Sequence, residues 1–326
     1  MTSEVAITGA SGLVGGHLAA RLIDSGTSVR AIVRSDEAAA KVESVGASAI
    51  IVDLFDRDGL RDAFWGVDVV YHVAGVNETC PRDAAAMDRV NIDGTTTVVG
   101  AAADAGAGRV VYTSSAAVIG EPEGTIGHEE TVHTGTYLSP YARSKKLAEE
   151  AAFAAAERSD VDLVAVLPSS VQGPGRSTGS ARILLHVLTT NRPRLMDTKV
   201  SIVDIEDCTD GHLAAAERGR RGERYLVSGA TISVADAVSL AEQITGETID
   251  PRWLSEGTVR RWGGLVARLA QIVRPSADVC PALVRTLLHG HRFDASKSER
   301  DLAMRYRPIE DTFARTIAWF ESEALI

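Results

Sequence analysis

The sequence predicts an α/β fold in which a doubly wound parallel sheet is joined to a smaller, mostly helical C-terminal lobe. Short apolar segments alternate with helical segments through the first half of the chain. Their nearly continuous Val, Ile and Ala content is typical of parallel strands that helices cover on both faces. The alternation ends near Pro168, and helical periodicity dominates the rest of the chain.

The first half contains the predicted sheet. Each predicted strand is a short apolar run, and each predicted helix repeats its apolar residues every three or four positions. We predict strands at 5–8, 28–33, 48–52, 67–73, 109–113 and 161–167, and helices at 13–24, 36–45, 57–65, 83–105 and 140–157. Right-handed crossovers arrange such a series as a doubly wound sheet, whose ligands bind beyond the carboxyl ends of the strands.

The second half starts with a Gly/Ser/Pro-rich loop at 169–179. Helices are predicted at 181–190, 207–218, 234–245, 258–273, 282–289 and 309–323, with short strands at 199–203 and 224–227. The chain has no internal repeat and no low-complexity linker, so we expect this half to fold against the sheet. We divide the chain into domains at 1–170 and 171–326, with some segments of the second returning to the core of the first.

The composition excludes several classes of protein. With 326 residues, 45% of them hydrophobic, and a net charge of −10, the chain can bury a large core but lacks the basic face of a general nucleic-acid binder. No apolar run reaches the roughly 18 residues of a membrane span, and the N-terminus lacks the basic start of a signal peptide. Cys80, Cys208 and Cys280 lie far apart without a CxxC pair. We therefore expect no disulfide framework, no cysteine zinc site and a cytoplasmic protein.

A glycine-rich turn, from Thr8 to Gly15, joins the first strand to the first helix. Gly9 permits the tight turn, Gly12 lets the backbone approach a pyrophosphate, and Gly15 allows the helix to pack closely on the strand. The N-terminus of the helix offers unpaired N–H groups and a positive dipole end to the phosphates. We interpret the turn as a dinucleotide site; the alternative interpretation is a glycine-rich turn that binds no ligand. The site would comprise Gly9, Ser11, Gly12, Leu13, Val14 and Gly15.

The end of the second strand predicts the choice of nicotinamide cofactor. A site that selects NAD(H) usually has an acidic residue here, on the ribose 2′-hydroxyl. This chain has Arg34 and Ser35, and the acids Asp36 and Glu37 come one turn later. A guanidinium and a hydroxyl suit a 2′-phosphate. We expect NADP(H) to be preferred, with NAD(H) also accepted; alternatively, Arg34 is only a solvent-exposed residue.

A YxxxK motif, from Tyr141 to Lys145, opens a predicted helix, and its two side chains share one helix face. A tyrosine has a pKa of about 10, which a neighbouring ammonium lowers, so the pair can exchange a proton with a substrate. A serine after the preceding strand, Ser114 or Ser115, could hold the reacting oxygen. Tyr137 is excluded, because the residue four positions on is Tyr141 and not a lysine.

The TGxxGxxG turn and the YxxxK motif resemble the extended branch of the short-chain dehydrogenase/reductase superfamily, the NAD-dependent epimerase/dehydratase family. The TGASG, VRAIVR and TSSA segments are most similar to dihydroflavonol-4-reductase-like and 3-beta-hydroxysteroid-dehydrogenase-like members. The resemblance covers nearly all of the chain and is specific up to about Gly175. It implies a Rossmann fold in which residues 1–170 bind NAD(P) and residues 171–326 form a substrate-binding lobe.

The resemblance also implies roles for individual residues. Ser115, rather than Ser114, matches the catalytic serine. Asn91 matches a helix asparagine that organises a proton-relay water, and it is otherwise an ordinary buried polar residue. Tyr141 matches the proton donor. Lys145 matches the lysine that lowers the pKa of this tyrosine and binds the nicotinamide ribose. Further cofactor contacts are implied for Asp53, Leu54, Val73, Ala74, Gly75, Pro168 and Ser170, where Asp53 would bond the adenine amine or would instead cap a helix.

The function that these motifs favour is an NADP(H)-dependent oxidoreductase that interconverts a ketone or aldehyde and an alcohol on a small organic substrate. One alternative is a nucleotide-sugar epimerase or dehydratase of the same fold, although Arg34 and the pair Ala116-Ala117 do not match that branch. Another is a non-catalytic NADP(H)-sensing regulator, although such proteins tend to lose the tyrosine or the lysine. A homodimer is compatible with the resemblance.

Two C-terminal features fall outside this scheme. Residues 252–292 carry seven arginines and two acids, against the charge of the rest of the chain. Their apolar, Arg-flanked part at 262–273 could cover a hydrophobic pocket, contact a membrane surface peripherally, receive an anionic substrate, or be an ordinary packed helix. His289 and His291 have no third ligand at a suitable spacing, so we expect no metal.

Overall fold

A computed structural model describes residues 4–177, 181–273 and 279–326. Its largest element is a seven-stranded sheet with the order β10-β6-β5-β4-β1-β2-β3, in which all neighbours are parallel. The strand order reverses next to β1, so the expected ligand position is the crevice beyond the carboxyl ends of β1 and β4. The strands are β1 (Glu4–Thr8), β2 (Ser28–Val33), β3 (Ser48–Ile51), β4 (Val69–His72), β5 (Arg109–Thr113), β6 (Leu163–Pro168) and β10 (Arg224–Val227).

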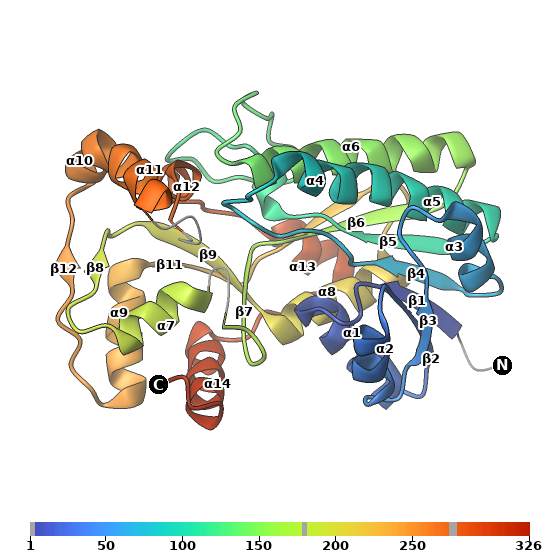
Figure 1. Ribbon diagram of the computed structural model, residues 1–326, viewed down its shortest axis with the longest axis horizontal. Helices are drawn as coiled ribbons and strands as arrows, with labels where there is room; N and C mark the ends of the chain where they lie inside the picture. Colours follow the sequence, from blue (N-terminus) through green and yellow to red (C-terminus); the bar gives the residue numbers. More distant parts are fainter. Residues whose placement is uncertain (1–3, 178–180, 274–278) are drawn as a thin grey trace.

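Helices cover both faces of this sheet (Figure 1). One face carries α3 (Arg57–Phe64), α4 (Ala84–Asp88), α5 (Thr95–Asp104) and α6 (Pro140–Ser159). The other carries α1 (Leu13–Asp24), α2 (Asp36–Glu43) and α8 (Ile205–Arg218). Each layer has its own apolar core, with Phe64, Val98 and Ala152 in the first and Leu18, Val42 and Cys208 in the second. Strands that are apolar on both faces require these two layers.

A smaller lobe lies beside the sheet, on the left in Figure 1. It contains a three-stranded sheet of β7 (Ser170–Gln172), β9 (Lys199–Asp204) and β11 (Ala230–Ser233), and a pair formed by β8 (Arg194–Leu195) and β12 (Arg252–Trp253). A separate apolar core that includes Leu240 and Phe320 lies among α7 (Ala181–Thr189), α9 (Val234–Thr245) and α14 (Ile309–Ser322). The lobe also contains α10 (Glu256–Thr258), the π-helical turn η3 (Val259–Gly263), α11 (Gly264–Val273) and α12 (Pro281–His289). Helix α13 (Ser296–Leu302) packs instead against α8 and β10 of the sheet domain.

The predicted fold class is confirmed, and several elements have their predicted bounds. These are the helices at 13–24 and 234–245 and the strands at 28–33, 109–113 and 224–227. The predicted helix at 83–105 is divided, because the π-helical segment η1 (Arg89–Gly94) lies between α4 and α5. The predicted loop at 169–179 contains β7 near its start, and its last two residues, Thr178 and Gly179, lie outside the described residues. Strands β8, β11 and β12 and helix α13 were not predicted.

Cys80 and Cys280 are joined by a disulfide, so the expectation of no disulfide framework is wrong. Cys80 lies in the loop between β4 and α4, and Cys280 is the N-cap of α12. The bond links the sheet domain to the lobe across a sequence separation of 200 residues. Spacing could not indicate it, because the two cysteines meet only in the folded chain. Cysteine usage therefore no longer supports a reducing compartment.

Candidate active site

The glycine-rich turn lies at the point where the strand order reverses. Gly9 has a φ of +78°, and a Cβ there would lie 2.6 Å from the backbone nitrogen of Ala74. A Cβ at Gly15 would lie 2.3 Å from the carbonyl oxygen of Gly9. Only glycine at these two positions therefore allows the turn to lie between the end of β4 and the first turn of α1.

The N-terminus of α1 provides the anion site that the turn predicts. Gly12 has no side chain to cap the helix, so the N–H groups of its first turn, including those of Leu13 and Val14, are left for a ligand. The carbonyl of Ser11 accepts a 2.8 Å hydrogen bond from the ammonium of Lys41 in α2. Lys41 therefore brings a positive charge to the turn, which no local motif indicated.

The end of β2 exposes a cation and a hydroxyl. Arg34 is exposed, and its guanidinium makes no hydrogen bond or ion pair with the part of the chain that the structure describes. Ser35 caps α2, since its Oγ accepts from the N–H of Ala38 at 3.3 Å, and its own O–H remains available to donate. Asp36 and Glu37 lie in the first turn of α2, where they stabilise the positive end of the helix dipole.

The segment after β3 lies exposed at the next strand end. Oδ1 of Asp53 accepts from the N–H of Phe55 at 2.8 Å. The cap of α3 is instead Asp56, so the alternative that Asp53 caps a helix is wrong. Leu54 packs against the apolar core of the first layer. The carboxylate of Asp53 is thus held by its own turn at the edge of the crevice.

Asn91, in the π-helical segment η1, holds the loop after β4. Its Oδ1 accepts from the N–H of Val76 at 2.7 Å, and its Nδ2 donates to the Val76 carbonyl at 3.1 Å. Nδ2 also donates to Oγ of Ser144 at 3.1 Å. These bonds fix the course of the segment Val73, Ala74 and Gly75 beside the turn. They link this segment to α6, the helix that carries the YxxxK motif.

Tyr141 and Ser115 come together at the carboxyl end of β5. Ser115 is the N-cap of the 3₁₀ turn η2 (Ala116–Val118), and Tyr141 is the second residue of α6. The hydroxyl of Ser115 lies beside the phenol of Tyr141 and favours its ionised form. Burial raises the pKa of Tyr141, while Ser115 and the positive charge of Arg176 act against this. Arg176, which follows β7, is a site residue that sequence reasoning missed.

Lys145 is buried one turn further along α6. Its Nζ donates to the hydroxyl of Tyr112 at 3.1 Å and to the carbonyl of Thr113 at 2.8 Å. Burial lowers the pKa of Lys145 to about 8, and the negative charge of Glu149 acts against the shift. The ammonium thus points at β5. The cation that lowers the pKa of Tyr141 here is Arg176, where the motif alone predicted Lys145.

Ser114 has a structural role. Its Oγ donates to Oε2 of Glu149 at 2.6 Å, and Glu149 pairs with Arg224 at 3.4 Å. The three residues fasten β5 to α6 and to β10. The hydroxyl that meets Tyr141 is therefore that of Ser115, the serine favoured by the resemblance.

The segment after β6 presents unpaired polar atoms at the same edge of the sheet. Pro168 ends β6, and Ser170 begins β7. Oγ of Ser169, Oγ of Ser170 and Oε1 of Gln172 are buried and have no hydrogen-bond partner among the described residues. Because such atoms are costly when unpaired, their presence indicates a polar ligand at this position.

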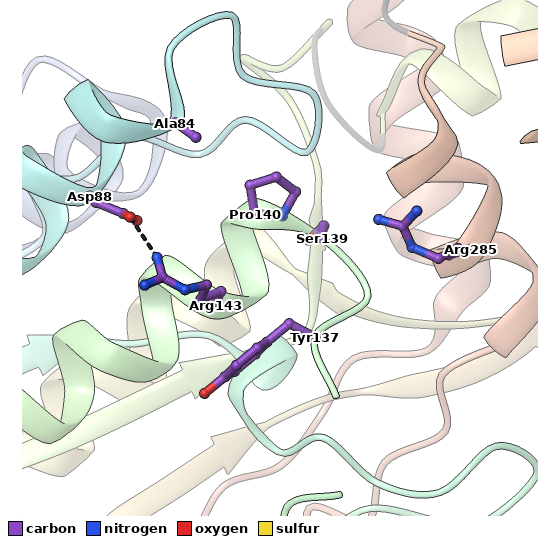
Figure 2. A pocket seen from close by; sticks show the side chains of 7 residues that line it. All are labelled: Ala84, Asp88, Tyr137, Ser139, Pro140, Arg143 and Arg285. Carbon is purple, nitrogen blue, oxygen red and sulfur yellow. Dashed lines mark hydrogen bonds and ion pairs between the residues drawn. The ribbon is translucent and has the colours of Figure 1, made fainter. Parts of the chain in front are cut away.

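A separate hollow of about 290 Å³ surrounds the first turn of α6 (Figure 2). Arg143 pairs with Asp88 at 2.6 Å on one side of it, and Arg285 reaches toward it from α12. Neither Tyr141 nor Lys145 is among its lining residues, so we do not assign the reaction to it. The lining residues are Ala84, Asp88, Tyr137, Ser139, Pro140, Arg143 and Arg285.

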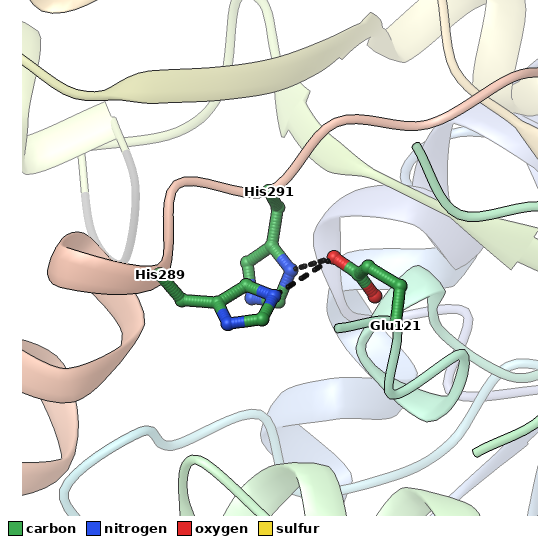
Figure 3. A group of neighbouring side chains, drawn as sticks. All are labelled: Glu121, His289 and His291. Carbon is green, nitrogen blue, oxygen red and sulfur yellow. Dashed lines mark hydrogen bonds and ion pairs between the residues drawn. The ribbon is translucent and has the colours of Figure 1, made fainter. Parts of the chain in front are cut away.

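His289 and His291 meet a third side chain, Glu121 (Figure 3). Glu121 supplies the third side chain that the sequence did not reveal, because it lies 168 positions from His289. Burial would raise the pKa of Glu121, but the hydrogen bonds from the two histidines hold it down at about 2. The carboxylate is thus ionised.

The arginine-rich segment carries an exposed apolar face. Six side chains on η3 and α11 are each at least 51% exposed: Trp262, Leu265, Val266, Leu269, Ile272 and Val273. Ala267 is the only buried residue of α11, which packs against α12 and leaves most of its apolar side chains exposed. Arg274 and Asp278, which contribute to the charge of the segment, lie outside the described residues. Among the helices that the structure describes, none has the length and apolar character to cross a membrane.

The fold and this arrangement of side chains define the class as NAD(P)-dependent oxidoreductases of the extended short-chain dehydrogenase/reductase type. The chain belongs to the NAD dependent epimerase/dehydratase family, whose model matches residues 5–228. The predicted family is therefore confirmed.

Individual relatives agree with this assignment. The chain is 29% identical over 332 residues to a putative dihydroflavonol 4-reductase of Synechocystis sp., covering 98% of this chain and 95% of that one. The solved structure of gox2253 superimposes with a TM-score of 0.87 at 27% identity, covering 100% of both chains. A Bacillus cereus UDP-glucuronic acid 4-epimerase, solved with UDP-glucuronic acid and NAD, has a TM-score of 0.78 at 21% identity over 98% of this chain and 99% of that one. At that identity the likeness shows the fold alone.

Proposed function

We propose that the chain is an NADP(H)-dependent oxidoreductase that interconverts a ketone or aldehyde and an alcohol on a small organic substrate. The observation that carries the proposal is that the Ser115 hydroxyl lies beside the phenol of Tyr141, one helical turn from the buried ammonium of Lys145. This supports a proton donor and an oxygen-positioning hydroxyl at the sheet edge that also carries the glycine turn.

The crevice fits a nicotinamide dinucleotide. The glycine turn leaves space and free N–H groups for a pyrophosphate, and the unpaired oxygens of Ser169, Ser170 and Gln172 suit a carboxamide. When bound, the nicotinamide supplies or accepts the hydride. We assign Asp53 and Leu54 to the adenine, Val73, Ala74 and Gly75 to its ribose, and Pro168 and Ser170 to the nicotinamide.

Three side chains support a preference for NADP(H). Arg34 offers an exposed guanidinium and Ser35 a hydroxyl, and Lys41 adds an ammonium beside Ser11. Together they form a cationic surface between the end of β2 and the glycine turn, which suits a 2′-phosphate. A site that selects NAD(H) has an acidic side chain in this place, and that carboxylate would repel the 2′-phosphate.

The chain's own residues supply the proton and the positioning. In reduction, Tyr141 donates its phenolic proton to the substrate oxygen, and Ser115 donates a hydrogen bond that holds this oxygen in place. The positive charge of Arg176 favours the phenolate that remains on Tyr141. In alcohol oxidation the same phenolate takes the proton back. Asn91 keeps the loop after β4 in position and, as the resemblance implies, would order a water that relays the proton.

The test compares the wild type with Tyr141→Phe on a panel of ketones and alcohols. Tyr141→Phe should retain NADPH binding, measured by fluorescence titration, and lose on the order of 10²- to 10⁴-fold in turnover. Tyr137→Phe is the matched control, because Tyr137 lines the other hollow. Normal turnover by Tyr141→Phe would exclude the mechanism. Equal kcat/KM for NADPH and NADH in the wild type, with no effect of Arg34→Ala, would exclude the cofactor preference.

A nucleotide-sugar epimerase is the second candidate, and its support is the match over residues 5–228 to the model of the NAD dependent epimerase/dehydratase family. The two functions differ in what happens to the cofactor. A reductase oxidises NADPH in equal amount to the ketone consumed. An epimerase converts its sugar nucleotide without a net change in nicotinamide absorbance, and that result would favour the second candidate.

We also propose that the protein contacts an anionic membrane surface through the exposed face of η3 and α11. A cytoplasmic location stays a prediction from the sequence, which the disulfide between Cys80 and Cys280 does not support. Trp262, Leu269 and Ile272 present apolar surface, and Arg261 and Arg268 stand beside them. An exposed apolar face with basic residues next to it is the pattern of a helix that lies in the bilayer interface.

A further inference from the structure

Glu121, His289 and His291 form a cluster that the proposed reaction does not use (Figure 3). Glu121 comes three residues after η2, and the two histidines lie at the end of α12. Nε2 of His289 lies 3.2 Å from Oε1 of Glu121, and Nδ1 of His291 lies 2.6 Å from the same oxygen. One ligand atom from each residue lies within 4.8 Å of those of the other two.

The backbone holds the two imidazoles side by side. Gly290 ends α12 with a φ of +66°, and its N–H donates to the carbonyl of Thr286 at 3.3 Å. This left-handed turn reverses the chain, so the ring centres of His289 and His291 are 4.7 Å apart. Phe293 stacks against His291 with ring centres 5.5 Å apart. The nitrogen donors are therefore oriented by the fold itself.

The carboxylate is poorly satisfied by its present partners. The side chain of Glu121 is 1% exposed, against 9% for His289 and 21% for His291. Oε1 takes both hydrogen bonds, and Oε2 is buried without a partner among the described residues. Its ion pairs within the described residues are with the two histidines. A buried carboxylate that lacks a permanent cation and leaves one oxygen unpaired carries a large desolvation penalty.

We propose that Glu121, His289 and His291 bind a divalent transition-metal ion, with Zn²⁺ as the best match. Two imidazole nitrogens and one carboxylate oxygen form a ligand set that zinc accepts, whereas Mg²⁺ and Ca²⁺ prefer oxygen ligands. Zinc bonds of about 2.0–2.1 Å in a tetrahedron separate the ligand atoms by roughly 3.3 Å. The 3.2 Å between His289 and Glu121 already matches this spacing, and the His291 pair must open slightly.

Metal binding displaces the imidazole protons that now face Glu121. Each imidazole now directs a nitrogen at Oε1 of Glu121, and metal binding needs the lone pair of that nitrogen. A neutral imidazole moves its proton to its other ring nitrogen, and a protonated one releases a proton to solvent. The ion supplies the positive charge that the buried carboxylate lacks. Three protein ligands leave a fourth position for water.

The ion would fasten the second end of α12. The first end is already tied to the sheet domain, because Cys280 caps α12 and is bonded to Cys80. Glu121 lies six residues after Ser115, so the site joins the lobe to the segment that leads out of the reaction centre. Metal binding should therefore hold the lobe on the sheet domain and raise the thermal stability of the whole chain.

The experiment uses the untagged full-length chain after removal of metal with EDTA. Titration calorimetry with ZnCl₂ should show one ion per chain, and the Tm should rise on addition of Zn²⁺. Glu121→Gln and His291→Gln should each weaken Zn²⁺ binding at least 10-fold and abolish the rise in Tm. His128→Gln is the matched control, because His128 forms an exposed pair with Glu130 at 3.0 Å that lies outside the cluster.

Two results would overturn the proposal. One is a wild type that binds no Zn²⁺ at micromolar concentration, which would leave the cluster as a hydrogen-bonded Glu–His network only. The other is a Glu121→Gln variant that binds Zn²⁺ as tightly as the wild type. Circular dichroism checks that each variant is folded. If Glu121→Gln does not fold, the wild type loaded with Co²⁺ decides the question, since a protein site of this type must produce visible d–d absorption at one equivalent.

Discussion

The disulfide between Cys80 and Cys280, whose Cα atoms are 5.9 Å apart, fastens the loop after β4 to the start of α12. Asn91 holds the same loop through the backbone of Val76, on the side that faces α6. The loop is thus fixed twice, by a covalent bond to the lobe and by hydrogen bonds to the helix layer. The walls of the cofactor crevice and the lobe are therefore mechanically connected.

Removal of this disulfide should destabilise the chain. Replacement of both cysteines, Cys80→Ser with Cys280→Ser, should lower the free energy of unfolding by about 2–4 kcal/mol, because the unfolded chain gains conformational freedom. Urea denaturation with and without dithiothreitol measures the effect. The reductant should shift the wild type to the curve of the double variant and leave the double variant unchanged. Identical curves for the oxidised and reduced wild type would contradict the prediction.

Tyr112 should set the charge state of Lys145. Tyr112→Phe removes the hydroxyl 3.1 Å from Nζ but retains the ring, whose centre lies 4.8 Å from that nitrogen. With one acceptor fewer, the buried ammonium is less stable, so the pKa of Lys145 should fall below about 8. The alkaline limb of the pH profile of kcat/KM should move to lower pH. Tyr306→Phe is the control, because its hydroxyl pairs with Ser298; equal profiles for both variants would count against the role of Tyr112.

Arg176 should control the pKa of Tyr141. Its positive charge lowers the pKa of Tyr141, so Arg176→Met should raise that pKa further. Alcohol oxidation needs the phenolate, and its rate should therefore rise at a higher pH than in the wild type. Arg143→Met is the control, since Arg143 is an exposed α6 residue paired with Asp88 at 2.6 Å. The idea fails if the oxidation profile of Arg176→Met overlays that of the wild type.

Local sequence patterns were sufficient for the parts of the site that lie on consecutive residues. The glycine turn depends on spacings of three residues and on a strand and a helix beside it, all of which can be seen in the sequence. Tyr141 and Lys145 share a helix face for the same reason. The bounds of α1, β2 and β5 follow from short apolar or amphipathic runs with clear ends.

Residues that meet across the fold could not be predicted in this way. Lys41 reaches Ser11 only because the fold brings α2 to the glycine turn, and the charge of Arg176 acts on Tyr141 only because the fold brings the segment after β7 near α6. Glu121 and His289 are separated by 168 positions. Strands β8 and β12 have two residues each, which is too short for any periodicity to show.

The exposed face of η3 and α11 should bind anionic vesicles. Flotation with liposomes of phosphatidylserine and phosphatidylcholine should carry the protein upward, and pure phosphatidylcholine should carry less. Leu269→Glu with Ile272→Glu should abolish flotation, because both side chains are more than half exposed and their loss removes no core. The control is Val132→Glu, an exposed apolar residue outside this face. Absence of the wild type from the anionic vesicle fraction would end the proposal.

Two buried histidines should make the stability depend on pH. His72 lies between the hydroxyls of Thr8 and Thr95, at 2.7 and 2.9 Å, and burial followed by the charge of Lys145 lowers its pKa to about 3. Burial lowers the pKa of His212 to about 4, although its hydrogen bond to the Cys208 carbonyl acts against this. Both histidines titrate near an ordinary pKa of about 6.5 when the chain unfolds.

Below pH 6.5 the unfolded chain therefore binds more protons than the folded one. The contribution to stability is complete above this pH and is lost as the pH falls toward the folded pKa values of His72 and His212. The loss should amount to about 2 kcal/mol per histidine at pH 5. Urea denaturation at pH 7, 6 and 5 measures it. His72→Gln should flatten the decline, whereas His186→Gln, at an exposed helix position, should not; equal slopes in the two variants would show that His72 is not the group responsible.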